Sequence, residues 1–192
     1  MSAALMEEEP RRHRIRVDEY YRMVEVGLLD PKARVELIDG EIIDMAPLGD
    51  PHMATVDRIN ELLIHAVSER AIVRCQGAVQ LGDYSAPQPD FTLLERRQDY
   101  YRSRRAVSSD VLLTIEVSDT TFKYDSGRKK SLYARHDVPE LWIIDIPRAR
   151  ILLFRRPSGD DYLEKSVLDV PDTMSIERLP GVALDLSPLF AR

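Results

Sequence analysis

The sequence predicts an α/β fold in which helices pack against a mixed β-sheet. Three features support this fold class: an amphipathic helical pattern at residues 50–70, an Asp-Gly hairpin signal at residues 39–40, and two strand-like runs, 111–117 and 141–146, that are apolar on both faces. Strands that are apolar on both faces are typical of sheets covered on two sides. The order of helices and strands along the chain indicates a mixed sheet with helices packed on it.

The first predicted helix spans residues 17–29, with Asp18 as its N-cap and Gly27 near its end. Residues 34–45 then alternate in polarity on both sides of Asp39-Gly40, which is the favoured two-residue hairpin turn because both central positions can take positive φ.

The second helix, residues 50–70, begins with Asp50 as N-cap and Pro51 in the first turn. Its apolar face is formed by residues at helical spacing, namely Val56, Ile59, Leu63 and Val67. Short strand-like runs follow, and a short helix at 125–138 interrupts them. The runs are 71–81, 90–94, 111–117, 141–146, 151–156 and 162–168.

The chain has 192 residues, so we expect a single domain at 17–192 after a disordered tail at 1–16. Its one cysteine, Cys75, excludes an intramolecular disulfide and a cysteine-cluster zinc site. The opening residues lack the apolar core of a signal peptide, and no run approaches the length of a membrane span. We therefore expect a soluble, cytoplasmic protein with no membrane partner.

The net charge of −6 argues mildly against constitutive nucleic-acid binding, because phosphate contacts need local positive charge. Five arginines nevertheless fall between Arg96 and Arg105, interleaved with Tyr100 and Tyr101. Such a run can follow a nucleic-acid backbone. Charge runs are more often solvated surface, and that is the simpler interpretation here.

Two carboxylates occur where apolar strands begin or end. Asp90 opens a strand after Gln88-Pro89, and Glu116 closes the run VLLTI. A buried carboxylate is costly unless it is paired or bound to a metal. Two of them at the ends of neighbouring strands can converge on a hard cation such as Mg²⁺. The alternative is that each caps a loop or pairs with an arginine.

Lys129 follows Glu116 by 13 residues, on the helix that returns to the next strand. Its spacing to Asp125 permits an ordinary helical ion pair, whereas its spacing to Tyr133 places both side chains on one helix face. If that face covers the strand ends, the ammonium lies beside the cation and can orient a water nucleophile.

Taken together, these residues resemble the Uma-type endonucleases, a bacterial group within the restriction-endonuclease-like PD-(D/E)XK superfamily. Each matching segment is weak alone, but the segments occur in the family's order over nearly the whole chain after the tail. They are VELIDGEI (35–42), PHMATVDRINELL (51–63), QPD (88–90), LTIEVSDTT (113–121), DSGRKKSLYARHDVPELWIID (125–145) and LPGVALDLSPLF (179–190).

The resemblance implies a restriction-endonuclease-like core preceded by a helix and a hairpin, and it implies roles for particular residues. Asp90 and Glu116 would be metal ligands, and the Val117 carbonyl would complete the metal shell. Lys129 would be the catalytic lysine, with neighbouring Lys130 as the alternative. Glu36, which precedes the hairpin turn, would add a metal or water contact.

The sequence departs from the family pattern at three positions. Ser118 stands where the superfamily has its usual lysine, Asp137 replaces a usual glycine, and Leu141 replaces a usual aromatic residue. We interpret His52, at a helix start, as a surface or capping contact rather than a ligand. Gln76 and Gln80 lie on a strand that can face the cleft, where a glutamine can position a water or a phosphate, but polar residues at the edge of the core are the simpler explanation.

The resemblance implies a Mg²⁺-dependent endonuclease acting on DNA, with Mn²⁺ as a substitute ion. Duplex DNA is the expected partner, and a homodimer would provide one site for each strand. The alternative is a non-catalytic, nuclease-like scaffold that binds nucleic acid or a protein, since fold alone does not settle function.

Overall fold

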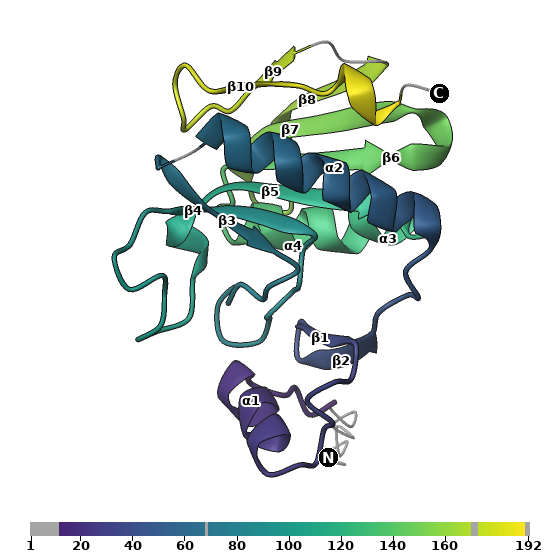
Figure 1. Cartoon of the computed structure of the whole chain (residues 1–192). Coiled ribbons are helices and arrows are strands. Elements are labelled where there is room, and N and C mark those ends of the chain that lie inside the picture. Colours follow the sequence, from purple (N-terminus) through teal and green to yellow (C-terminus); the bar gives the residue numbers. More distant parts are fainter. Residues whose placement is uncertain (1–11, 68, 170–172, 191–192) are drawn as a thin grey trace, which may run out of the picture.

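The computed structural model describes residues 12–67, 69–169 and 173–190. A six-stranded mixed sheet with strand order β3-β4-β5-β6-β7-β8 forms its centre (Figure 1). Only the β5–β6 pair is parallel among these strands; the other pairs are antiparallel. The six strands are β3 (Ala71–Cys75), β4 (Phe91–Glu95), β5 (Val111–Ser118), β6 (Glu140–Asp145), β7 (Arg150–Ser158) and β8 (Asp161–Asp169).

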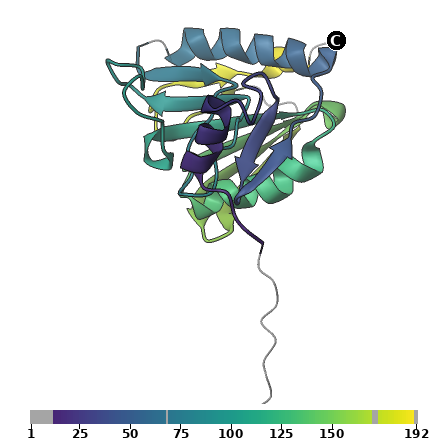
Figure 2. The ribbon, with the colours of Figure 1, turned by 90° about the horizontal axis from the view of Figure 1, so that it is seen from below.

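The two faces of the sheet are covered by different elements, as seen from below in Figure 2. Helix α2 (Asp50–Val67) and the small hairpin of β9 (Thr173–Ser175) and β10 (Ala183–Asp185) pack on one face. Helix α4 (Lys130–Arg135) packs on the other. Every residue of β5 and β6 is buried, which confirms the predicted mixed sheet with central strands covered on both sides.

The N-terminal helix and hairpin form a third, smaller cluster beside the sheet. Helix α1 (Val17–Glu25) packs against β1 (Val35–Ile38), which pairs with β2 (Glu41–Asp44). Asp39 and Gly40 have φ of 53° and 82°, as the predicted Asp-Gly turn requires.

The structure differs from the sequence-based predictions at the start of α1. The N-cap of α1 is Arg16 instead of Asp18, and its amide donates a hydrogen bond of 2.7 Å to Glu19. Residues 1–11 of the predicted disordered tail lie outside the described residues. Residues 12–16, also predicted to be disordered, are placed by contacts such as the 3.0 Å hydrogen bond from the Ile15 amide to the Gly40 carbonyl.

The strand predicted at 71–81 ends at Cys75, because Gln76 adopts a φ of 46° that takes the chain out of the sheet. Between β5 and β6, the chain forms the short helix α3 (Phe122–Tyr124), a π-helical turn (Asp125–Lys129) and then α4. Among the described residues, no helix combines the length and hydropathy that crossing a membrane requires.

Candidate active site

The site lies where the beginning of β4 and the end of β5 meet. Phe91 pairs with Ile115 across these antiparallel strands. Asp90, which precedes Phe91, and Glu116, which follows Ile115, therefore lie at the same end of the sheet. A cavity of about 450 Å³ opens there. The residues that line it come from β1, β2 and the segment that follows β2, the start of α2, the segment just before β4, the end of β5 and the α3–α4 region.

Asp90 is held from two sides. The Val117 amide donates a hydrogen bond of 2.8 Å to Oδ2. Nε2 of His52, in the first turn of α2, lies 3.1 Å from Oδ1. The Gln76 side-chain amide is 3.5 Å from Oδ1 as well. These contacts fix the carboxylate so that it faces the cavity.

Glu116 is almost fully buried, and the hydroxyl of Tyr133 donates a hydrogen bond to its Oε1. Burial raises the pKa of Glu116 to about 8, an effect that Lys129 opposes and that the charges of Asp125 and Asp90 reinforce. Within the described residues, its hydrogen bond and ion pair both involve Oε1. The charged form of this carboxyl group is therefore disfavoured, and a bound cation would stabilise it.

Lys129 ends the π-helical turn and is the only lysine that lines the cavity in the described part of the chain. Its Nζ lies 2.8 Å from Glu116 and 3.5 Å from Glu36. Although burial favours the neutral amine, the charges of these carboxylates raise the pKa of Lys129, so the ammonium stays protonated. Lys130 points elsewhere, because its Nζ is 2.6 Å from Asp161 on β8.

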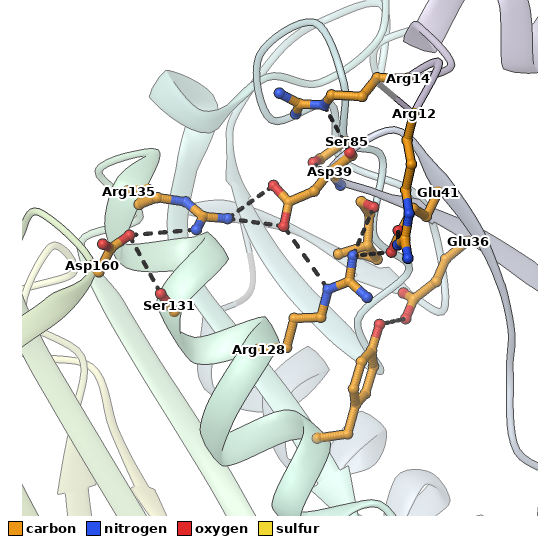
Figure 3. Close-up of polar contacts among 12 residues, drawn as sticks. Arg12, Arg14, Glu36, Asp39, Glu41, Ser85, Arg128, Ser131, Arg135 and Asp160 are labelled. Carbon is orange, nitrogen blue, oxygen red and sulfur yellow. Dashed lines mark hydrogen bonds and ion pairs between the residues drawn. The ribbon is translucent and has the colours of Figure 1, made fainter. Parts of the chain in front are cut away.

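Glu36 reaches the cavity from β1. Its Oε2 accepts a hydrogen bond of 3.0 Å from the Gln88 amide, and its Oε1 accepts one of 3.3 Å from the Tyr124 hydroxyl. Figure 3 shows the hydrogen bond that Glu36 accepts from the tyrosine hydroxyl, and the ion pairs that hold the hairpin against the α3–α4 region.

Asp39, at the tip of the hairpin, is the centre of those ion pairs. It accepts hydrogen bonds of 2.9 Å and 3.1 Å from Arg135, and Arg128 lies 3.9 Å away (Figure 3). Arg128 also donates a 2.7 Å hydrogen bond to Glu41. The hairpin that carries Glu36 is thereby fixed to the helical segment that carries Lys129.

The donor set suits a hard divalent cation. Six carboxylates line the cavity against Lys129, Arg34 and His52: Glu36, Asp44, Asp90, Glu116, Asp119 and Asp125. In the described ranges, no group of three or more His, Cys, Asp or Glu side chains is placed so that it could hold a metal ion by itself. Mg²⁺ does not need one, since it commonly binds through one or two carboxylates, retains several waters and uses substrate phosphates. The carboxylates of Asp90 and Glu116, which lie at the same end of the sheet and line the cavity, fit this mode.

The structure thus brings Asp90, Glu116, Val117, Lys129 and Glu36 to one cavity. Ser118, at the usual lysine position of the superfamily, instead donates a 2.7 Å hydrogen bond from Oγ to Asp125.

The sequence-based interpretation of His52 as a surface or capping contact is wrong. Its ring is buried beside Asp90, and its Nδ1 has no hydrogen-bond partner among the described residues. Gln80 is not among the residues that line the cavity, and its side chain donates a hydrogen bond to the Gly82 carbonyl, as expected of a polar residue at the edge of the core. The contact between His52 and Asp90 depends on how α2 packs against the sheet, and helical spacing alone does not reveal this packing.

Comparison with known proteins identifies the fold and the family of this chain. The crystal structure of a putative nuclease belonging to DUF820 from Anabaena variabilis ATCC 29413 superposes with a TM-score of 0.67 and 19% identity, covering 92% of this chain and 97% of that one. At this identity the likeness shows the shared fold. No curated protein matches at a significant level. The sequence model of the Uma2 family, described as "Putative restriction endonuclease", matches residues 17–187, and the chain therefore belongs to this nuclease-like family.

Proposed function

We propose that this protein is a metal-dependent endonuclease that hydrolyses phosphodiester bonds in DNA. The observation that carries the proposal is that Asp90, Glu116 and Lys129, which come from different elements, line one acidic cavity. Family membership supports nuclease chemistry. Duplex DNA as substrate and a homodimer with one site per strand extend the proposal.

Asp90, Glu116 and the Val117 carbonyl would hold Mg²⁺, for which Mn²⁺ can substitute. When bound, the ion would polarise the phosphoryl oxygen and lower the pKa of a water molecule. The contacts of Asp90 with His52 and Val117 keep that carboxylate in place for binding.

Lys129 acts as a fixed positive charge. Because its pKa is raised, it donates hydrogen bonds and does not act as a general base. Its ammonium orients the attacking water and stabilises the negative charge that develops on the phosphoryl oxygens in the transition state. Glu36, 3.5 Å from Nζ, accepts a hydrogen bond from that water and keeps it aligned.

The two adjacent lysines provide a matched test. We expect Lys129→Met to reduce cleavage of supercoiled plasmid DNA with Mg²⁺ or Mn²⁺ by at least about 100-fold, the cost of removing one preorganised electrostatic group. Lys130→Met removes the same charge outside the cavity and should retain most activity. The measurement is the rate of conversion to nicked and linear plasmid.

Circular dichroism spectra of both variants control for folding. Wild-type-like cleavage by Lys129→Met would refute the assigned role. If the wild type cleaves neither duplex nor single-stranded DNA with either ion, the non-catalytic scaffold becomes the better description.

A further inference from the structure

A second hollow, of about 650 Å³, lies between the end of β3 and the loop that joins β4 to β5. The two segments are in direct contact, since the Gln80 amide donates a 2.9 Å hydrogen bond to the Ala106 carbonyl. Among the described residues that line this arginine groove, four are arginines and none is a carboxylate. They are Arg74, Ala78, Gln80, Tyr101, Arg102, Ser103, Arg104, Arg105 and Val107.

Arg74 is a half-buried cation in this groove. Its guanidinium lies 5.3 Å from the centre of the Tyr101 ring and donates a 3.2 Å hydrogen bond to the Ala78 carbonyl. Burial lowers the pKa of Arg74, an effect that the charges of Tyr101, Tyr21 and Asp110 only partly oppose, and in the described part of the chain no carboxylate forms an ion pair with it. A partly desolvated charge without a counter-ion is unfavourable, and a bound anion would compensate it.

The other arginines complete a positively charged surface. Arg104 and Arg105 bind carboxylates outside the groove, Asp110 at 2.6 Å and Asp18 at 3.0 Å. Arg102 is exposed, and no hydrogen bond or ion pair of its side chain occurs within the described ranges. The groove therefore presents at least two guanidinium groups, Arg74 and Arg102, that are available to an anion.

The backbone of the loop is strained where the arginines gather. Tyr100 and Tyr101 have φ of 51° and 63°, a region that bulky residues rarely adopt. Two consecutive residues in this conformation persist only if the surroundings enforce it. Asp99 does so here, since it accepts hydrogen bonds of 3.3 Å from the amides of Tyr101 and Ser103. The groove is a built feature of the fold.

The groove is close to the candidate active site. Arg74 pairs with Thr92 across β3 and β4, and Thr92 follows Asp90 by two residues, which is about 7 Å along an extended strand. One nucleic-acid strand carries a phosphate every ~3.4 Å of helix axis. A nucleic-acid strand with one phosphate beside Asp90 would therefore place another phosphate beside Arg74 within about three nucleotides.

We propose that the arginine groove binds the sugar-phosphate backbone of the nucleic-acid strand that passes through the candidate active site. Arginine suits this task because its planar guanidinium offers paired donors to phosphate oxygens. The choice of ligand rests on the proposed function, but the groove binds phosphates whether or not the chain cleaves.

The test is binding without cleavage, on the full chain in the presence of EDTA. Fluorescence anisotropy measures the Kd of a labelled duplex of about 20 base pairs, and of the matching single strand, over roughly 50 to 300 mM salt. We expect Arg74→Gln/Arg102→Gln to make the negative slope of log K against log salt shallower, by about 1.8 for a duplex or about 1.4 for a single strand, since two phosphate contacts are lost. At 0.1 M salt this corresponds to about an eightfold loss per duplex contact.

Two comparisons keep this test decisive. Arg58→Gln removes the same charge from the exposed side of α2, where Arg58 pairs with Glu61 at 2.8 Å, and should leave the slope unchanged. The single variant Arg102→Gln changes an exposed side chain. It therefore tests phosphate binding by the groove even if the substitution at Arg74 disturbs folding.

A slope that changes for either the duplex or the single strand supports the groove, and the form that responds identifies the substrate strand. Equal slopes for the Arg102 and Arg58 variants, or no wild-type binding to either DNA, would overturn the proposal. If the wild type binds DNA and the Arg102→Gln variant binds it with a shallower salt slope, but the wild type does not cleave plasmid, only the proposed catalysis is refuted.

Discussion

The Asp90 carboxylate is positioned by His52, a residue whose place at a helix start suggested a surface or capping contact. Because Nε2 of His52 lies 3.1 Å from Oδ1, the imidazole fixes the orientation of the carboxylate without entering the proposed metal shell. Groups that orient metal ligands in this way typically contribute 10- to 100-fold in metal affinity.

We therefore expect His52→Leu to weaken Mn²⁺ binding about 10- to 100-fold, measured by isothermal titration calorimetry. His52→Gln should retain affinity within a few-fold, because the glutamine amide can supply the lost donor. An Asp90→Ala/Glu116→Ala variant, expected to bind no Mn²⁺, serves as the reference. Equal Mn²⁺ affinity in the leucine variant and the wild type would rule out this role.

Residue spacing was sufficient to nominate Lys129, since Lys129 and Tyr133 share a helix face and both reach Glu116. It did not reveal that the turn is π-helical. A π-helical turn inserts one extra residue per turn, and such turns are frequent at functional sites. The turn is followed directly by Lys130, which points to Asp161. Tertiary packing decides which of these two neighbouring lysines enters the cavity, and residue spacing does not reveal it.

At the scale of elements, an ion pair between Arg104 and Asp110 closes the end of the loop between β4 and β5. Arg104 donates hydrogen bonds of 2.6 Å and 2.7 Å to the carboxylate of Asp110, which also accepts one from the Val107 amide. The hydrogen bonds from Arg104 lower the pKa of Asp110, and partial burial opposes this effect. A lowered pKa in the folded state means that the charged carboxylate stabilises the fold.

This ion pair predicts a pH dependence. The stabilisation is fully present above the pKa of an unfolded aspartate, about 3.9, and is lost as the pH falls through the lower folded value. We expect Asp110→Asn to reduce the free energy of unfolding at pH 7 by about 1 kcal/mol, a modest value because Arg104 is partly exposed. Urea denaturation of both proteins at pH 7 and near pH 3 should show this difference shrinking in acid. A difference that does not change with pH would contradict the ion-pair account.

Elements with strong local signals were predicted well. The Asp39-Gly40 turn follows from two residues, and the apolar face of α2 follows from four residues at helical spacing. Asp137 shows the limit of that approach: it stands where the family usually has glycine, and its φ of 56° is the left-handed conformation that glycine adopts most easily. The substitution is compatible with the turn because aspartate tolerates this conformation better than most residues.

At the scale of the whole molecule, the sequence predicted the mixed sheet but not the hairpin β9–β10 that completes one of its faces. Its strands are three residues each, too short for an alternating pattern to stand out. The hairpin is instead specified by long-range contacts. Met174 and Leu184 join the core beneath α2, and the Glu177 amide donates a 2.9 Å hydrogen bond to Glu140 on β6.

Glu140 is therefore a long-range anchor, and its fully buried carboxylate has four hydrogen bonds within the described residues. The donors are Trp142 at 2.7 Å, Arg155 at 2.7 Å and 3.0 Å, and the Glu177 amide. Removing the charge from one member of a buried pair leaves the other uncompensated, which costs about 3–5 kcal/mol. That is a large fraction of the roughly 5–15 kcal/mol by which a domain is stable.

Glu177 provides the matched comparison, because it is half exposed and its carboxylate lies 3.9 Å from the same Arg155. We expect Glu140→Gln to lower the free energy of unfolding in urea by about 3–5 kcal/mol, and Glu177→Gln by less than about 1 kcal/mol. Hydrogen exchange of the β9 and β10 amides should accelerate in the Glu140 variant first, since the hairpin loses its attachment to the central sheet. Similar small losses in both variants would show that the apolar core beneath α2, and not this carboxylate, holds the hairpin in place.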